Sequence, residues 1–297
     1  MFITAKRAEG LRERTIKDHK RHFRYLTTWM AENIGSDDII ISDLDIQILR
    51  HYINFMQNEL KVSPVTVNVR LRTLRAFLGF IFDEGYCSEN LAKKIRLMKT
   101  DKDKIKIMSD THIQAILNVI DTKSYTGYRD YVLIMLLLDT GMRIGEATTL
   151  TTDQIDFENS TIYLEAKKVK TRVGRYVPIS IKVNKLLFTL DQDNKKYFIN
   201  SKEIFLSVYG TPFQKTSFRK RLNYYKEKAG IKDARIFPHS FRHYFAKNYI
   251  LSGGDPFTLQ QILGHSDIQM VRRYIQMSGL DVKLQHHKFS PVQRFRF

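Results

Sequence analysis

Arginine, histidine and tyrosine side chains recur in short polar segments along the second half of the chain. Arg143 follows an apolar run in TGMRIGE, and His239 and Arg242 are three residues apart in HSFRH. Near the end, His265 lies in LGHSDIQ, and Tyr274 follows two arginines in RRYIQ. A buried aromatic ring normally has apolar neighbours. The cationic surroundings of this tyrosine therefore indicate that it meets an anion.

Together with Lys170, these side chains contain the groups that phosphoryl transfer requires. Two arginines can bind the non-bridging oxygens of a phosphate and stabilise the charge that grows in the transition state. Histidines transfer protons near neutral pH, and a lysine can protonate a leaving alkoxide. A tyrosine, whose ordinary pKa is about 10, becomes a nucleophile when cations and a base stabilise its phenolate. Because the arginines supply the positive charge, we expect no metal ion and no cofactor.

The same residues also have plainer structural explanations. Arg143 could form an internal ion pair with Glu146, because a buried charge needs a partner. His265 could cap the C-terminus of the helix before it, and Tyr274 could be a core residue. The sequence leaves these alternatives open for each residue taken alone.

Zinc is the other chemistry to consider at HSFRH. His239 and His243 are four residues apart, a spacing that places both on one helical face. The metalloprotease signature, however, requires glutamate where Ser240 stands, and the single cysteine, Cys87, removes thiolate sites. A metal site is therefore not expected here.

A basic segment, KKVKTRVGRYVP, lies between two runs in which apolar and polar residues alternate. The alternation predicts a β-hairpin that turns between Lys170 and Gly174. A lysine in such a turn is ordinarily only solvated, but five cations together suit a phosphate backbone or a groove of nucleic acid. This predicted basic finger contains Lys167, Lys168, Lys170, Arg172 and Arg175.

The elements around the hairpin are predicted to be helical. YVLIMLLL indicates a buried helix that is followed by a turn at Thr140–Gly141. FPHSFRHYFAKNYILSGG indicates a helix that ends before Gly253. DPFTLQQILGHS predicts another, with Pro256 near its start and Gly264 at its end. These helices must position the arginines and histidines.

The first third of the chain is predicted to be entirely helical. Trp29 is expected in its core, and SDLDIQILRHYINFMQ predicts a helix with Ser42 as N-cap and Asp45 in its first turn. A further helix starts with Ser63 as cap and Pro64 at its first position. Its arginines lie off the apolar stripe, where they are either solvated or in contact with a DNA backbone. They are Arg70, Arg72 and Arg75.

The charged stretch KKIRLMKTDKDKIKIMSD has the character of a linker. We therefore predict a helical domain over residues 1–100, a linker near residues 98–104, and a second domain over residues 105–297. Both domains are mainly α-helical, and the hairpin adds a small antiparallel β-sheet to the second, so the fold class is α+β.

Charge is the most informative bulk property of the chain. Its 297 residues include 49 Lys+Arg against 31 Asp+Glu, a net charge of +18. Such a surplus predicts a polyanionic partner, of which nucleic acid is the usual one. One cysteine allows no internal disulfide, the N-terminal segment lacks the apolar run of a signal peptide, and the longest apolar run, YVLIMLLL, is too short for a membrane span. We expect a cytoplasmic, nucleoid-associated protein without a membrane partner.

In order and spacing, the candidate residues resemble the pattern of the tyrosine recombinase (phage integrase) family. The family order is Arg, Lys, His-x-x-Arg, His or Trp, Tyr, and the interval from His265 to Tyr274 is 274 − 265 = 9 residues, as the family pattern has it. The resemblance covers the last two-thirds of the chain in detail. The helical first third resembles the family's core-binding domain in general character. The pattern here reads Arg143, Lys170, His239, Arg242, His265 and Tyr274.

The resemblance implies a role for each of these residues. Tyr274 would attack a DNA phosphate, forming a 3′-phosphotyrosyl bond and leaving a 5′-hydroxyl. Arg143 and Arg242 would clamp that phosphate, and Lys170 would act as general acid towards the 5′ oxygen. The covalent bond would conserve the energy of the phosphodiester, so that strand exchange needs no ATP.

Three further roles follow from the same resemblance. His239 would serve the tyrosine as acid and base, His265 would donate a hydrogen bond to the phosphate, and Glu146 would brace Arg143. The implied protein is a site-specific DNA recombinase of a phage or mobile element, acting as a homotetramer on paired double-stranded sites. Accessory DNA-bending or directionality proteins would be its further partners, and the segment after Tyr274 could pack on a neighbouring subunit.

Three other functions compete with this interpretation. A type IB-like topoisomerase shares the chemistry but only relaxes supercoils. A non-catalytic DNA-binding regulator of the same fold would lack at least one of the six residues, and none is missing. A metal-dependent nuclease would need an acidic cluster with metal-ligand spacing, which the sequence does not contain.

Overall fold

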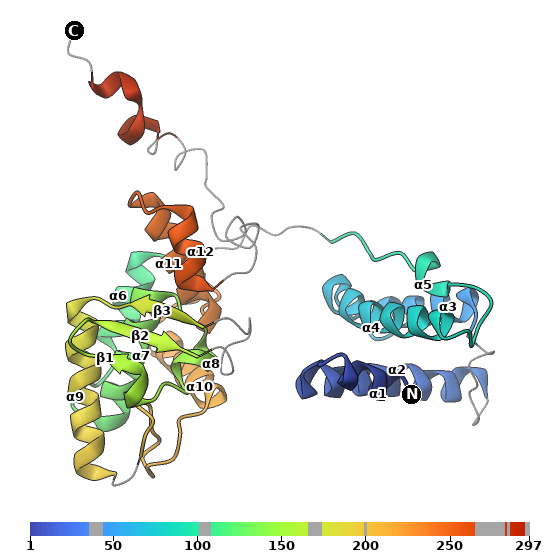
Figure 1. Cartoon of the computed structure of the whole chain (residues 1–297), viewed down its shortest axis with the longest axis horizontal. Coiled ribbons are helices and arrows are strands. Elements are labelled where there is room, and N and C mark those ends of the chain that lie inside the picture. The colour runs from blue at the N-terminus through green and yellow to red at the C-terminus, as the bar shows by residue number, and fades with distance from the viewer. Residues whose placement is uncertain are drawn as a thin grey trace. The chain divides into compact units, whose positions relative to one another are not determined.

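The computed structural model of the protein describes residues 1–35, 44–100, 108–165, 174–198, 201–264, 283 and 286–294. The chain divides into two compact units, Met1–Asp103 and Lys104–Phe297 (Figure 1). Across the described ranges the protein is mainly α-helical with one small antiparallel sheet, which confirms the predicted fold class. Within those ranges no helix is both long and apolar enough to cross a membrane.

The first unit is built from helices around one hydrophobic core. They are α1 (Phe2–Ala8), α2 (Glu13–Ile34), α3 (Ile46–Asn58), α4 (Pro64–Asp83) and α5 (Leu91–Lys94). Leu71, Leu74 and Leu78 of α4 are buried in this core, as their helical spacing predicts. Trp29 is also buried there, with its ring 5.2 Å from the ring of Tyr52, and its predicted place in the core is confirmed.

The N-termini of α3 and α4 follow from their capping residues. Ser63 accepts a hydrogen bond from the N–H of Thr66 and Pro64 occupies the first turn, as predicted. At α3 the N-cap is Asp45, which accepts from the N–H of Ile48 at 2.7 Å. The prediction that put Asp45 inside the first turn was therefore wrong, and Ser42 lies outside the described residues.

The described part of the second unit consists of helices around a three-stranded sheet. Its helices are α6 (Asp110–Asn118), α7 (Tyr125–Thr140), α8 (Ile144–Ala147), α9 (Ile181–Tyr197), α10 (Lys215–Lys228), α11 (Pro238–Leu251) and α12 (Pro256–Leu263), with short 3₁₀ turns at Thr152–Gln154 and Pro291–Arg294. The strands are β1 (Ile155–Asp156), β2 (Thr161–Leu164) and β3 (Arg175–Pro178).

The sheet has the order β1-β2-β3 and both of its pairs are antiparallel. Tyr163 lies opposite Tyr176 and Leu164 opposite Arg175, which confirms the predicted hairpin. Its turn, residues 166–173, lies outside the described residues. β3 lies beside α12, at the side of the sheet that faces α11 and α12 in Figure 1.

Helix α7 is the buried centre of the second unit and packs against α9 and α11. Its residues Val132, Leu133 and Leu137 are completely buried, as the apolar run predicts. The helix ends at Gly141, which has a positive φ of 60° and donates its N–H to the carbonyl of Leu137. Gly264, with φ of 62°, ends α12 in the same way, so both predicted helix ends are confirmed.

Candidate active site

Arg143 is the N-cap residue of the short helix α8, directly after the turn that ends α7. Its backbone N–H donates to Oε2 of Glu146 at 3.0 Å, and its Nη1 donates to Oε1 of the same carboxylate at 3.0 Å. The Arg143 side chain keeps 20% of its surface exposed, while that of Glu146 keeps 5%. Glu146 therefore holds both the backbone and the guanidinium of Arg143, and this geometry agrees with the bracing role that the resemblance implies.

A second guanidinium binds the same carboxylate. Arg175 of β3 donates from Nη2 to Oε2 of Glu146 at 2.8 Å, and its Nε donates to the carbonyl of Ile262 at 2.9 Å. Burial alone would raise the pKa of Glu146, but the hydrogen bond and charge of Arg175, with those of Arg143, hold that pKa below its ordinary value. The carboxylate is therefore ionised at neutral pH, and the three side chains together carry one surplus positive charge.

The burial of Arg175 corrects one prediction. Arg175 was assigned to the basic finger that contacts DNA, yet only 8% of the residue is exposed and its donors point to Glu146 and Ile262. Along β3, Arg175 and Val177 are buried while Tyr176 and Pro178 are exposed. Because alternate side chains of a strand face opposite ways, Arg175 points inward with Val177.

Arg242 lies in α11 and is almost completely buried, with 1% of its surface exposed. Its Nη1 donates to the carbonyl of Gly141 and its Nη2 to the carbonyl of Leu263, each at 2.8 Å. One guanidinium thus joins the end of α7, two residues before Arg143, to the last residue of α12. Since a helix C-terminus carries partial negative charge, a cation at Leu263 also stabilises α12.

Gly264 lies where β3 meets the end of α12. A β-carbon at this position would come within 2.9 Å of Cδ and Nη1 of Arg175. The missing side chain therefore leaves the space through which Arg175 reaches Ile262. The positive φ of Gly264 imposes the same choice of residue independently.

His239 and His243 lie one turn apart on α11, with ring centroids 6.2 Å apart. His239 is exposed and His243 half-buried. Burial, together with the nearby charges of His239 and Arg242, lowers the pKa of His243 to about 4, so His243 is neutral at physiological pH. In the described part of the chain no three His, Cys, Asp or Glu side chains are grouped so that they could hold a metal ion.

Several predicted site residues lie outside the described residues. This applies to three of the six catalytic candidates, Lys170, His265 and Tyr274, and to the three further members of the basic finger Lys167, Lys168 and Arg172. The structure brings together Arg143, Glu146 and Arg242 around the turn at Gly141, and places His239 on the same helix as Arg242.

The predicted DNA-binding arginines of α4 differ in their surroundings. Arg72 and Arg75 are exposed, whereas Arg70 is half-buried with its guanidinium 4.3 Å from the ring centre of Tyr25. This cation–π contact gives Arg70 a structural role within the first unit. Arg72 and Arg75 are the two of this group that present their charges to solvent.

A basic helix surface was missed from the sequence. Helix α10 buries Phe218, Leu222 and Tyr225, and its exposed side carries Lys215, Arg219 and Lys220. The segment KTSFRKRLNYYKEK contains the signal, because these apolar residues recur at spacings of four and three with cations between them.

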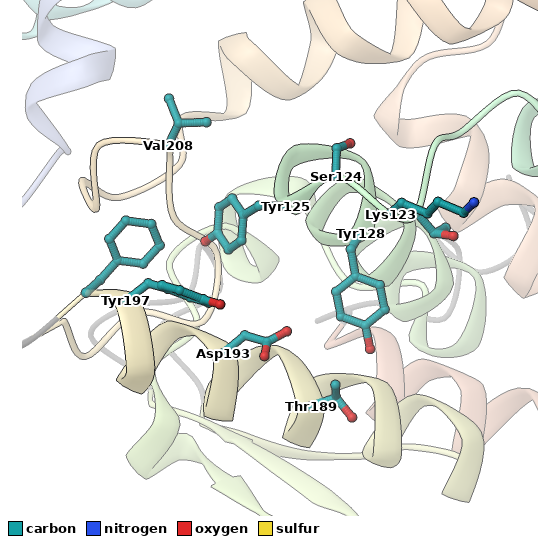
Figure 2. A pocket seen from close by; sticks show the side chains of 10 residues that line it. Lys123, Ser124, Tyr125, Tyr128, Thr189, Asp193, Tyr197 and Val208 are labelled. Atoms are coloured by element: carbon teal, nitrogen blue, oxygen red, sulfur yellow. The ribbon is translucent and has the colours of Figure 1, made fainter.

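A cavity of about 660 Å³ lies elsewhere in the second unit, between the start of α7 and the end of α9 (Figure 2). Tyr125, Tyr128, Asp193 and Tyr197 are among its lining residues, none of which is a candidate site residue. Tyr125 donates its hydroxyl to Oδ1 of Asn194 at 2.9 Å, and burial raises its pKa to about 12. Its phenol is therefore protonated and structural at neutral pH.

Comparison with known proteins identifies the class. The phage integrase family matches residues 106–279, and the phage integrase SAM-like domain matches residues 2–97. Tyrosine recombinase XerC of Pelotomaculum thermopropionicum is 26% identical over 94% of this chain and 92% of its own length. Tyrosine recombinase XerD of Staphylococcus aureus is also 26% identical, over 95% of this chain and 94% of its own.

Solved structures agree in fold. The Tn1549 transposon integrase in complex with a circular intermediate DNA gives a TM-score of 0.76 at 22% identity, over 97% of this chain and 98% of that one. A lambda integrase dimer bound to a core site gives 0.74 at 17% identity, over 94% of both chains. The chain therefore belongs to the phage integrase family, as its residue pattern predicted. It is an enzyme of the tyrosine recombinase class, whose reaction cleaves and rejoins DNA strands.

Proposed function

We propose that this protein is a site-specific recombinase that cleaves DNA through a 3′-phosphotyrosyl intermediate formed by Tyr274. One observation carries the proposal: Arg242 donates to the carbonyl of Gly141, and so fixes its own helix to the turn that presents Arg143. Two arginines from separate segments are thereby held at one place. Paired guanidiniums of this kind suit the two non-bridging oxygens of a phosphodiester.

The surplus charge around Glu146 supports the same proposal. Glu146 offers one negative charge to Arg143 and Arg175, and uncompensated positive charge in a largely buried place is costly. A bound phosphate supplies the missing anion. Arg143 is the member of this cluster that keeps exposed surface, so it is the one that would contact the phosphate.

The remaining catalytic roles are proposed from the family pattern. Lys170 protonates the 5′ oxygen as it leaves, and His239 exchanges the proton of Tyr274. His265 donates a hydrogen bond to the phosphate. The exposure of His239 at the start of α11, one turn before Arg242, is compatible with its share of this chemistry.

DNA is the proposed partner over a wider surface. The net charge of +18 favours it, and α4 and α10 each present exposed cations, Arg72 and Arg75 on the first and Lys215, Arg219 and Lys220 on the second. We propose that these side chains contact the phosphate backbone. Lys167, Lys168 and Arg172 of the basic finger would add to this surface.

The biological role that we propose is integration or excision of a phage or mobile element by a homotetramer on paired sites in the cytoplasm. A solved neighbour, lambda integrase, forms a tetramer bound to a Holliday junction, and the Tn1549 enzyme is a transposon integrase. The XerC and XerD relatives, which are tyrosine recombinases, support site-specific recombination in the coarser sense.

Covalent capture tests the proposal. Wild-type protein and Tyr274→Phe are mixed with DNA flanking the gene and with a random-sequence pool, denatured in SDS, and the DNA that remains attached is sequenced. Tyrosine-dependent attachment at a discrete sequence is the expected result. Attachment at all sequences would favour a topoisomerase. Binding without attachment would favour a non-catalytic regulator, and a Phe variant that still attaches would refute the assignment of Tyr274.

A further inference from the structure

We infer that Arg175 is a positioning residue for DNA cleavage, one that sets the placement of Arg143 through Glu146; the inference rests on the proposed function. Arg175 is outside the six-residue pattern, and its side-chain donors are directed to Glu146 and Ile262. Its contacts, however, reach the carboxylate that binds Arg143 and the end of α12 that Arg242 also binds.

The first contact is with the brace of Arg143. Each oxygen of the Glu146 carboxylate accepts from Arg143 at 3.0 Å: Oε1 from the guanidinium and Oε2 from the backbone N–H. Arg175 contacts the same two oxygens, with Nη2 at 2.8 Å from Oε2 and Nη1 at 3.5 Å from Oε1. Without Arg175, only Arg143 would hold the Glu146 carboxylate, and the direction of the Arg143 guanidinium would be less firmly fixed.

The second contact is with the end of α12. Nε of Arg175 donates to the carbonyl of Ile262, and Nη2 of Arg242 donates to the carbonyl of the next residue, Leu263. Both guanidiniums therefore hold the same helical end. Arg175 thus connects Glu146, and through it Arg143, to the helical end that Arg242 also binds.

The geometry requires arginine at this position. The guanidinium directs Nε to one acceptor and Nη2 to another in a fixed plane, and a lysine has a single nitrogen that cannot replace both. Misplacement of a catalytic group by about 1 Å can slow a reaction about a hundredfold. We therefore expect Arg175→Met to lower the cleavage rate about a hundredfold at saturating DNA, and Arg175→Lys to lie between Met and wild type.

The chain offers a matched control in Arg129. Arg129 is 3% exposed and donates to the carboxylate of Asp130 at 2.7 Å and to the carbonyl of Leu206 at 2.8 Å. Arg129→Met therefore removes the same kinds of hydrogen bond as Arg175→Met. Asp130 and Leu206 are not candidate site residues. A general effect of losing a buried arginine would appear in both variants, whereas a positioning effect would appear only at Arg175.

The experiment measures single-turnover formation of the covalent complex at saturating DNA, together with the DNA dissociation constant and thermal unfolding, at a temperature where every variant is folded. The expected result is a large loss of rate with nearly unchanged affinity for Arg175→Met, a partial rescue by Arg175→Lys, and a rate close to wild type for Arg129→Met. Equal losses in the two methionine variants, or a loss confined to affinity, would overturn the inference.

A double-variant cycle tests the path through Glu146. If Arg175 acts by holding that carboxylate, Arg175→Met should slow cleavage much less in a Glu146→Gln background than in the wild type. Fully additive losses would show that Arg175 acts by another route. Absence of tyrosine-dependent attachment in the wild type would instead refute the proposed function itself, so the two failures are distinguishable.

Discussion

Replacing Gly141 by alanine tests whether the turn between α7 and α8 is as crowded as the structure shows. An added β-carbon would lie 2.5 Å from Cδ1 of Phe245 and 2.8 Å from Cδ2 of Leu263. Neither neighbour moves easily, because Leu263 is completely buried and Phe245 packs against the ring of Tyr249. Gly141 also has a φ of 60°, a conformation that alanine adopts only under strain.

The two effects can be separated with Gly230. Gly230 has a similar φ of 68°, but a β-carbon there would meet nothing within 4 Å. Left-handed strain costs about 1–2 kcal/mol and should be common to both alanine variants. Overpacking adds about 1–3 kcal/mol and should affect Gly141→Ala alone. We expect unfolding free energies lower by about 3.5 kcal/mol for Gly141→Ala and about 1.5 kcal/mol for Gly230→Ala.

Thermal unfolding followed by circular dichroism measures the difference. At about 3 °C per kcal/mol for a domain of this size, the melting temperature should fall by about 10 °C for Gly141→Ala and about 5 °C for Gly230→Ala. Cleavage at a temperature where both are folded should fall only in Gly141→Ala, because the carbonyls of Gly141 and Leu263 are acceptors of Arg242. Equal shifts in the two melting temperatures would refute the packing around Gly141.

Three further predictions concern charges. Glu146→Gln should lower the unfolding free energy at pH 7 by about 3 kcal/mol, because two guanidiniums lose their carboxylate. Since the folded pKa of Glu146 is depressed, its contribution is present above the ordinary glutamate pKa of about 4.3 and is lost as pH falls through the lower folded value, so urea melts should show the two proteins converging in acid. The pKa of His243 is also depressed, from 6.5 to about 4, so as pH falls from 6.5 to about 4 the unfolded state takes up a proton that the folded state does not, and the free energy of unfolding decreases. His243→Gln should flatten this part of the pH profile of stability, and an unchanged profile would contradict the prediction. The double variant Arg72→Gln/Arg75→Gln should weaken DNA binding and reduce the slope of log affinity against log salt by about 2 if each arginine contacts one phosphate, and an unchanged slope would remove α4 from the interface.

Elements with strong local signals were predictable from the sequence. Ser63 and Pro64 start α4, and Gly141 and Gly264 end α7 and α12, because caps and left-handed turns depend on the residue itself. The start of α3 was harder to locate, since Ser42 and Asp45 are both good capping residues and only the structure shows that Asp45 accepts from Ile48.

The hydrogen-bond network around Arg143 and Arg242 could be predicted from the sequence only where it is local. Arg143 and Glu146 are three residues apart, so their ion pair could be anticipated from helical spacing. The bond from Arg242 to Gly141 joins residues 101 positions apart, and nothing local indicates it. Arg175 was misassigned because net charge was given more weight than strand alternation, although its place two residues before the buried Val177 indicated the inner face.

The contact between Arg175 and Gly264 has a consequence for sequence variation and engineering. These positions are 89 residues apart, yet one side chain occupies the space that the other leaves empty. In homologous sequences, a larger residue at position 264 should therefore occur only where the arginine is absent and α12 ends without a positive φ. A hairpin transplanted from a relative should function only if position 175, Glu146 and position 264 are exchanged as one unit, and a library that randomises the hairpin should keep all three fixed.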